Sequence, residues 1–302
     1  MSLSSKLHDA WRKNSPELLG FFNGSFPDFV LARAPKPLQG FIPVFHYHLV
    51  ETPRFEADLK FLSENNYTTI DADQMVDYLC RRTQLPTKAV LLTFDDGPKN
   101  FYEVAFPLLR KYRHKAVHFI APALHEEHRD DFNPDWPRPM TWAQLREIHA
   151  SGLVQIQSHT LESRYVPAWP RPAALAGVHP EIENARRGEP RDLKEDLLAA
   201  KQLLEERLPG STVRHLAFPQ YDGNDAAVRI AQEVGYVGLF WGQLPTRPMN
   251  RPGDSPLQIT RISGEYLRRL PAQRRISLWE LAVQRRQIIN EGIQWRSKFA
   301  GS

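Results

Sequence analysis

Two adjacent carboxylates follow an apolar run in the segment LLTFDDGPKN, residues 91–100. Asp95 and Asp96 come directly after the run, and Gly97-Pro98 predicts a sharp turn that exposes both side chains at the end of a strand. Neighbouring carboxylates both stay ionised only where a cation or hydrogen-bond donors hold them. The pair therefore predicts a site for chemistry at this strand end, and an Asp-Gly turn that caps a helix is the alternative.

A histidine at the end of a second apolar run is a candidate metal ligand. His159 follows LVQIQS, residues 153–158. A second histidine one helical turn further on would complete a metal-binding pair, but the four positions after Thr160 read Leu-Glu-Ser-Arg. The stretch thus begins like a metal site and lacks one ligand.

Strand-like and helix-like patterns alternate along the chain, and this alternation predicts how the polar residues are positioned. Helical spacing and capping residues predict helices over 71–79, 141–152 and 192–210. Short apolar runs predict strands over 42–48, 67–70, 89–94, 116–121, 153–158, 214–218, 236–241 and 257–262. Strands that alternate with helices favour a parallel sheet with covering helices, so we expect one α/β domain built as a barrel.

Two Pro-rich insertions, residues 124–139 and 161–191, leave from the carboxyl ends of predicted strands, where α/β barrels carry their active sites. We expect an N-terminal extension over 1–40, the barrel over 41–265, and a basic C-terminal helix over 266–302 that packs on the barrel. That last segment holds eight basic and two acidic residues between positions 268 and 298, although the net charge of the whole chain is only +4. A solvated basic edge is the default interpretation, and peripheral contact with an anionic membrane is the alternative.

The composition limits the other classes of function. The single cysteine, Cys80, excludes an intrachain disulfide, and no apolar run has the length needed to span a bilayer. The N-terminal segment has no continuous apolar stretch of the kind found in signal peptides, so we expect a cytoplasmic protein. No basic stripe interleaved with aromatic residues is present, and nucleic-acid binding is not expected.

The motif TFDDGP, followed some sixty residues later by SHT, resembles the polysaccharide deacetylase family, the NodB-homology domain. The resemblance covers roughly residues 40–265, and Tyr47-His48 is similar to the branch that contains poly-N-acetylglucosamine deacetylases. It implies a distorted (β/α) barrel that removes N- or O-acetyl groups from sugars. It also implies a divalent metal, with zinc expected, held by one aspartate and two histidines.

Carried over residue by residue, the resemblance makes Asp95 the general base, Asp96 a metal ligand and His159 the first metal-binding histidine. A metal polarises the acetyl carbonyl and lowers the pKa of its bound water, so the two carboxylates suit this chemistry. The second histidine of the family, four or five residues after the first, is missing, because Ser163 and Arg164 occupy those positions. Glu162 and His179 are nearby candidates for a third ligand if the loop folds inward. Two protein ligands would hold zinc weakly.

The acid that protonates the leaving amine is expected to be His48, the histidine found at this early strand end in the same branch. His46 points to the same face of the strand, so alternation does not choose between them. Arg214, in RHLAFPQYDGN, resembles an arginine that orients the base, and a surface charge is the alternative. His118 is expected in the core.

We therefore expect a metal-dependent deacetylase of the barrel type that acts on an acetylated sugar or glycoconjugate. Because one metal ligand is missing, the alternative is a catalytically degenerate barrel that binds glycans or a protein partner. The sequence specifies neither the sugar nor its linkage.

Overall fold

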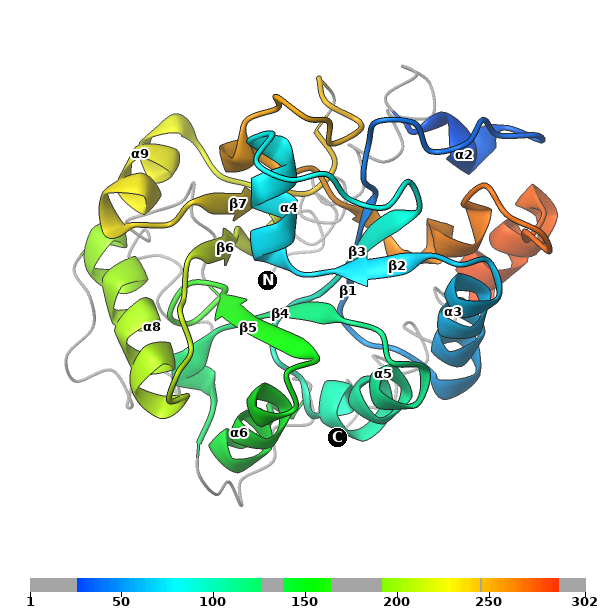
Figure 1. Ribbon diagram of the computed structural model, residues 1–302. Coiled ribbons are helices and arrows are strands. Elements are labelled where there is room, and N and C mark those ends of the chain that lie inside the picture. Colours follow the sequence, from blue (N-terminus) through cyan, green and yellow to red (C-terminus); the bar gives the residue numbers. More distant parts are fainter. Residues whose placement is uncertain (1–25, 127–137, 164–191, 245, 288–302) are drawn as a thin grey trace, which may run out of the picture.

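A parallel sheet curves around the centre of the molecule, and Figure 1 shows its strands ringed by helices. The computed structural model describes residues 26–126, 138–163, 192–244 and 246–287. Within these ranges the strands follow the order β7-β6-β5-β4-β3-β1-β8, with β2 beside β3. Their bounds are β1 Val44–Tyr47, β2 Thr68–Ile70, β3 Ala89–Phe94, β4 Ala116–Ile120, β5 Val154–Ser158, β6 His215–Ala217, β7 Gly238–Phe240 and β8 Ile262–Ser263. Every ladder between these strands is parallel, so the predicted α/β class is confirmed.

The predicted helices are confirmed, and side-chain caps fix where they begin. Asp71 and Gln74 form a capping box on α4 (Ala72–Leu79), and Thr141 and Gln144 form one on α6 (Trp142–Ala150). Asp192 caps α8 (Leu193–Arg207). The other described α-helices are α2 (Asp28–Leu31), α3 (Thr52–Glu64), α5 (Phe106–Tyr112), α9 (Asp225–Val234) and a helix that begins at residue 278.

The buried apolar residues form two clusters, one on each face of the sheet, and the strands contribute side chains to both. Successive strand residues point to opposite faces, so on β3 Val90 and Leu92 pack outward against the helices while Leu91 packs inward. The inward cluster includes Met75, Val76 and Leu79 of α4, which lies inside the ring of strands in Figure 1. Because α4 covers the amino-terminal end of the barrel, the carboxyl-terminal end is left for the site.

The barrel is closed by residues 259–263, which pair with two different strands. Ile259 bridges Phe240 at the end of β7, and its N–H donates to the carbonyl of Leu239 at 2.9 Å. Three residues later, Ile262 of β8 pairs with Phe45 of β1. The predicted strand over 257–262 was therefore misplaced, since residues 256–258 form a 3-10 turn instead. Arg261 lies between the two points of pairing.

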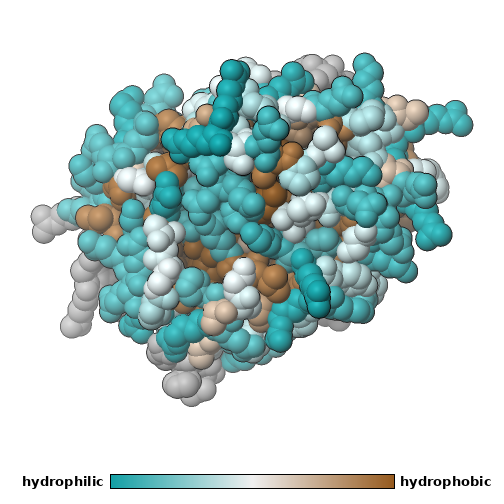
Figure 2. All heavy atoms as spheres, in the orientation of Figure 1, coloured by the Kyte–Doolittle hydropathy of each residue, from teal (hydrophilic) through white to brown (hydrophobic). Residues whose placement is uncertain are grey.

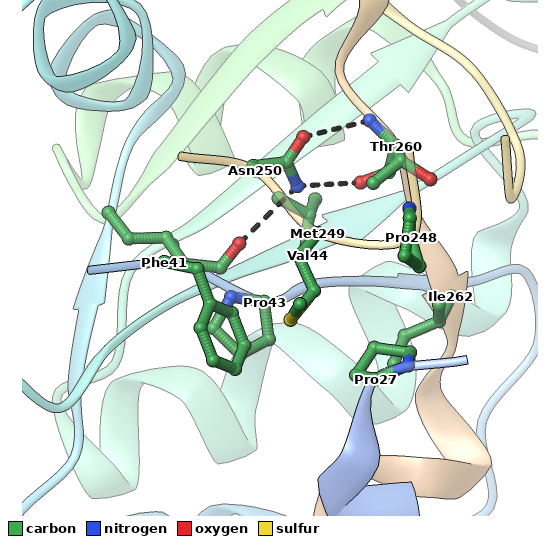
Figure 3. Close-up of a pocket in the computed structure, with 10 residues that line it drawn as sticks. Pro27, Phe41, Pro43, Val44, Pro248, Met249, Asn250, Thr260 and Ile262 are labelled. Carbon is green, nitrogen blue, oxygen red and sulfur yellow. Dashed lines mark hydrogen bonds between the residues drawn. The ribbon is translucent and has the colours of Figure 1, made fainter. Parts of the chain in front are cut away.

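Asn250 fixes this closing segment to the start of β1, as Figure 3 shows beside a small pocket. Its side-chain amide donates to the carbonyl of Thr260 at 2.9 Å and to that of Ile42 at 3.3 Å, while its oxygen accepts the N–H of Thr260 at 3.0 Å. Asn250 is almost fully buried, so these bonds form away from solvent. They hold the backbone of the residue directly before Arg261.

Several arginines of the C-terminal segment are used inside the fold. Arg269 is buried and donates to the carbonyls of Val30, Ala32 and Ile276, and Arg275 donates to Phe29. Arg268 pairs with Asp58. This part of the basic segment is therefore not the solvated edge that we predicted, because its guanidinium groups satisfy backbone carbonyls and a buried carboxylate.

The surface fits a folded domain whose apolar residues lie mainly inside. Hydrophilic residues cover most of the face in Figure 2, and apolar residues show only in small patches. Among the helices that the structure describes, none is long and apolar enough to cross a membrane.

Candidate active site

Four of the predicted site residues meet at the carboxyl end of the barrel. Asp95 and Asp96 follow β3, His48 follows β1, and His159 follows β5. The neighbouring strands are held in register there, because the N–H of Asp95 donates to the carbonyl of Tyr47 at 3.1 Å. Parallel strands end at one edge, so residues more than a hundred positions apart become neighbours.

Asp95 is buried and held by an arginine that the sequence analysis did not single out. Nη1 of Arg261 donates to Oδ1 of Asp95 at 2.7 Å, and Nε of Arg261 donates to the carbonyl of Trp241 at 2.8 Å. Burial alone would raise the pKa of Asp95, but the positive charge of Arg261, with His159 and His48 nearby, lowers it below its ordinary value. Asp95 is therefore held as a carboxylate.

Arg214 does not reach Asp95, and the prediction that it orients the base was wrong. It directly precedes β6, at the opposite end of the barrel, where its Nη1 lies 3.7 Å from Oδ1 of Asp73 and its side chain is about half exposed. Arg261 is the arginine that contacts Asp95 instead. A single charged residue within the strand-like run LQITRI was the available signal in the sequence.

Asp96 lies beside Asp95 on a turn with left-handed backbone. Its φ is 70°, and that of Gly97 is 74°. A side chain at position 97 would also collide with His125, since its Cβ would lie 2.5 Å from the ring, so the turn requires glycine there. The turn separates the two carboxylates and directs Asp96 toward the histidines.

Oδ1 of Asp96 lies 3.4 Å from Nε2 of His159 and accepts a hydrogen bond from the hydroxyl of Ser163 at 3.0 Å. Oδ2 lies 3.8 Å from Nε2 of His48. Burial alone would raise the pKa of Asp96, but His159, His48 and Ser163 together lower it below its ordinary value. Asp96 is thus ionised and surrounded by donors.

The orientation of His159 suits a metal ligand. Its Nδ1 donates to the carbonyl of Ala217 at 2.9 Å, which fixes the ring and turns Nε2 toward Asp96. Ligating histidines typically use such a second hydrogen bond to hold the ring in place. Burial alone would lower the pKa of His159, but Asp96 and Asp95 raise it above its ordinary value.

Asp96 and His159 therefore fit two ligands of a divalent metal. Among the described residues, no group of three or more His, Cys, Asp or Glu side chains is arranged to hold a metal ion. Ser163, which stands where the family pattern has a histidine, contacts Asp96 through its hydroxyl. Glu162, one of the two candidates for a third ligand, is among the described residues and completes no such group with Asp96 and His159. His179, the second candidate, and Arg164 lie outside the described residues.

His46 and His48 lie beside each other, as strand alternation predicts, with ring centroids 6.1 Å apart. Burial, and then the charge of Arg261, lower the pKa of His46 well below its ordinary value, so His46 stays neutral. The side chain of His48 is 41% exposed and reaches Asp96, which makes it the more accessible of the two. The hydroxyl of Tyr221 lies next to both rings, and the sequence analysis did not identify this residue.

His118 has the predicted core position. It is fully buried, and its ring centroid lies 4.0 Å from that of Phe101.

Comparison with known proteins agrees with this arrangement. The family model described as polysaccharide deacetylase matches residues 82–239, just over half of the chain. The chain belongs to the polysaccharide deacetylase family. It is 31% identical over 153 residues to the poly-beta-1,6-N-acetyl-D-glucosamine N-deacetylase of Escherichia coli (strain K12). That match covers 45% of this chain and 23% of the relative, so the chain corresponds to less than a quarter of the curated protein.

Solved structures of deacetylases have the same fold. IcaB from Ammonifex degensii is 26% identical, with a TM-score of 0.58, and the match covers 74% of this chain and 92% of that one. The BpsB deacetylase domain from Bordetella bronchiseptica is also 26% identical, with a TM-score of 0.59 and coverage of 76% and 98%. These similarities confirm the predicted distorted (β/α) barrel of the polysaccharide deacetylase family.

Proposed function

We propose that the protein is a carbohydrate N-deacetylase that hydrolyses the acetamido C–N bond of an N-acetylated sugar. The observation that carries this proposal is the carboxylate pair at the end of β3, with His48 and His159 around Asp96. Family membership and the named activity of the Escherichia coli relative support a hydrolase that acts on such bonds. An O-acetyl group is a second possible target of the same chemistry.

In this proposal Asp95 is the general base. Its Oδ1 is held by Arg261, so its second oxygen is the one that takes the proton of the attacking water. Arg261 keeps the carboxylate ionised and fixes its direction, so the free oxygen is in the protonation state that a general base needs to accept a proton.

His48 is the proposed general acid. The sugar nitrogen is a poor leaving group until it is protonated, and an imidazole supplies a proton near neutral pH. Of the two histidines on β1 and directly after it, His48 is the more exposed, and its Nε2 lies 3.8 Å from Oδ2 of Asp96.

Asp96 and His159 would hold a divalent metal, with zinc the expected ion. Such a metal polarises the acetyl carbonyl and lowers the pKa of a bound water. Since the described residues supply two protein ligands, we expect its affinity to be lower than that of a three-ligand site. We also propose a cytoplasmic location, which the single exposed cysteine, Cys80, supports. In that location the substrate would be a small acetylated precursor.

Acetate release tests the proposed function. The wild-type protein, purified without chelators and supplied with zinc, should release acetate from β-1,6-linked N-acetylglucosamine oligomers or from N-acetylated sugar precursors. The Asp95→Asn variant should be folded by circular dichroism and at least a hundredfold slower. Activity that survives in this variant would show that Asp95 is not the base.

A degenerate, binding-only barrel is the second candidate, and Ser163 in place of a metal ligand favours it. It predicts saturable binding of the same oligomers by calorimetry without acetate release at any zinc concentration.

A further inference from the structure

Tyr221 reaches the site through an unusual turn. It belongs to the loop after β6, where Gln220 and Tyr221 have successive φ values of 56° and 66°. Left-handed backbone is unfavourable for residues other than glycine and costs roughly 1 kcal/mol or more at each position. The turn places the Tyr221 hydroxyl 3.2 Å from Nδ1 of His46 and 3.4 Å from the ring nitrogens of His48.

Three contacts keep Tyr221 in this place. The N–H of Gly242 donates to the carbonyl of Tyr221 at 3.0 Å. A Cβ on Gly242 would lie 2.5 Å from Cβ of Tyr221, so only glycine allows this approach. The guanidinium of Arg261 lies 5.6 Å from the centroid of the Tyr221 ring, within the range of a cation–π contact. The residue that holds Asp95 therefore also packs on Tyr221.

The ring and the hydroxyl of Tyr221 thus face different partners. The ring contacts Arg261, on the side of the base, while the hydroxyl lies between the two histidines. A phenol has one O–H to donate and lone pairs to accept, so one hydroxyl can bond both rings at once. The Nδ1 of His46 is the closer acceptor, and the His48 ring has a nitrogen within reach that can donate back.

We infer that Tyr221 is a positioning residue for proton delivery: its hydroxyl donates to His46, accepts from His48, and thereby aims the His48 ring at the nitrogen of the leaving sugar. His46 is the anchor of this arrangement, and Tyr221 itself touches neither substrate nor water in the role assigned to it. The inference rests on the proposed deacetylase function and deepens it. A tyrosine kept only for packing would be replaced by phenylalanine without effect.

The inference is tested with two substrates that differ in their need for an acid. An N-acetylated sugar leaves as an amine and needs a proton, whereas para-nitrophenyl acetate leaves as a stable phenolate and needs none. Tyr221→Phe keeps the ring on Arg261 and removes the hydroxyl, so kcat on the sugar should fall about tenfold or more with KM little changed, while ester hydrolysis stays at the wild-type rate. Tyr221→Ala removes the ring as well and should slow both substrates.

Two further variants separate positioning from general damage. Gly242→Ala displaces the Tyr221 ring together with its hydroxyl and touches no histidine, so it should slow both substrates as Tyr221→Ala does, with folding checked by thermal unfolding. In a His48→Ala background, Tyr221→Phe should cause no further loss, because the ring that it positions is gone.

The results that overturn the inference are distinct from failure of the proposed function. Equal sugar turnover in Tyr221→Phe and wild type, an equal loss on both substrates in Tyr221→Phe, or a further loss in the His48→Ala background would each overturn the role of Tyr221 alone. A wild-type protein that hydrolyses the ester but no acetamido sugar would overturn the proposed function, and the role of Tyr221 with it.

Discussion

Arg261 donates from Nη1 to Oδ1 of Asp95 at 2.7 Å, and both side chains are almost completely shielded from solvent. The two residues come from different parts of the barrel, one from the end of β3 and the other from the segment that joins β7 to β1. The pair therefore connects the proposed base to the closure of the barrel. A buried charge without its partner is costly, so substitution of either residue alone should lower both the free energy of unfolding and the activity.

Arg261→Met should destabilise the protein by about 3–5 kcal/mol, because it leaves the Asp95 carboxylate buried without a partner. Urea unfolding measures this change. The double variant Asp95→Asn/Arg261→Met should recover much of the stability and none of the acetate release. Arg214→Met is the matched control: its ion pair with Asp73 is partly exposed, so we expect a change below about 1 kcal/mol and normal turnover. If Arg214→Met lost acetate release while Arg261→Met kept it, Arg214 would be the arginine that orients the base, as the sequence predicted.

The strands and most helices could be predicted because their signals are local. The apolar run over 89–94 and the caps at Asp71 and Thr141 depend on neighbours in sequence, and the structure has these elements where they were expected. The closing segment could not be placed in the same way. It makes one bridge to β7 and a short ladder to β1, so its conformation depends in part on a strand that lies more than 200 residues earlier in the sequence.

The site shows the same division. Asp95, Asp96 and His159 stand directly after apolar strands, and a strand end is visible in the sequence. Arg261 is placed beside Asp95 by the closing segment. Tyr221 is placed beside the histidines by two successive residues with left-handed backbone, which no local sequence pattern predicts. The prediction for Arg214 was wrong for a related reason. Arg214 stands at the beginning of a strand, whereas the site lies at the carboxyl ends of the strands.

His48→Ala should lower turnover on an acetamido sugar by roughly a hundredfold, the usual contribution of a general acid. His46→Ala should have a smaller effect, because His46 is inferred to anchor Tyr221 rather than to give up a proton. Steady-state kinetics of acetate release compares the two. Small and equal losses in both variants would assign these histidines to packing and leave the acid unidentified.

The Asp96–His159 pair should make stability depend on pH. The pKa of Asp96 is lowered from 3.8, so its contribution is present above that value and is lost as the pH falls through the lowered pKa. The pKa of His159 is raised from 6.5, so its contribution is complete below 6.5 and is lost as the pH rises through the raised pKa. The stabilisation by the pair is therefore greatest between these two ordinary values.

The difference in melting temperature between wild type and Asp96→Asn, measured with chelator present, should thus be larger near pH 6 than near pH 9. Asparagine tolerates the left-handed backbone at position 96, so the comparison isolates the charge. A difference that stays constant across this range would show that the two side chains do not form an ion pair.

Ser163→His should increase zinc affinity. The Ser163 hydroxyl already donates to Asp96 at 3.0 Å, so a side chain at this position is directed toward the proposed metal ligands. Histidine there restores the spacing of four residues from His159 that the family uses, and histidine is among the residues that tolerate the φ of 55° at position 163. A third protein ligand should tighten zinc binding at least tenfold in calorimetric titration, since zinc sites in proteins normally use three or four.

Ser163→Ala is the matched control, because it removes the hydroxyl from Asp96 without adding a ligand. Its zinc affinity should not exceed that of wild type. Tighter binding in Ser163→His together with faster acetate release would show that the wild-type site works with an incomplete ligand set. Tighter binding without any acetate release would favour the binding-only barrel, since the metal would then be present and the chemistry absent. Tight, stoichiometric zinc in the wild type would contradict the prediction, because it would require a third ligand in addition to Asp96 and His159.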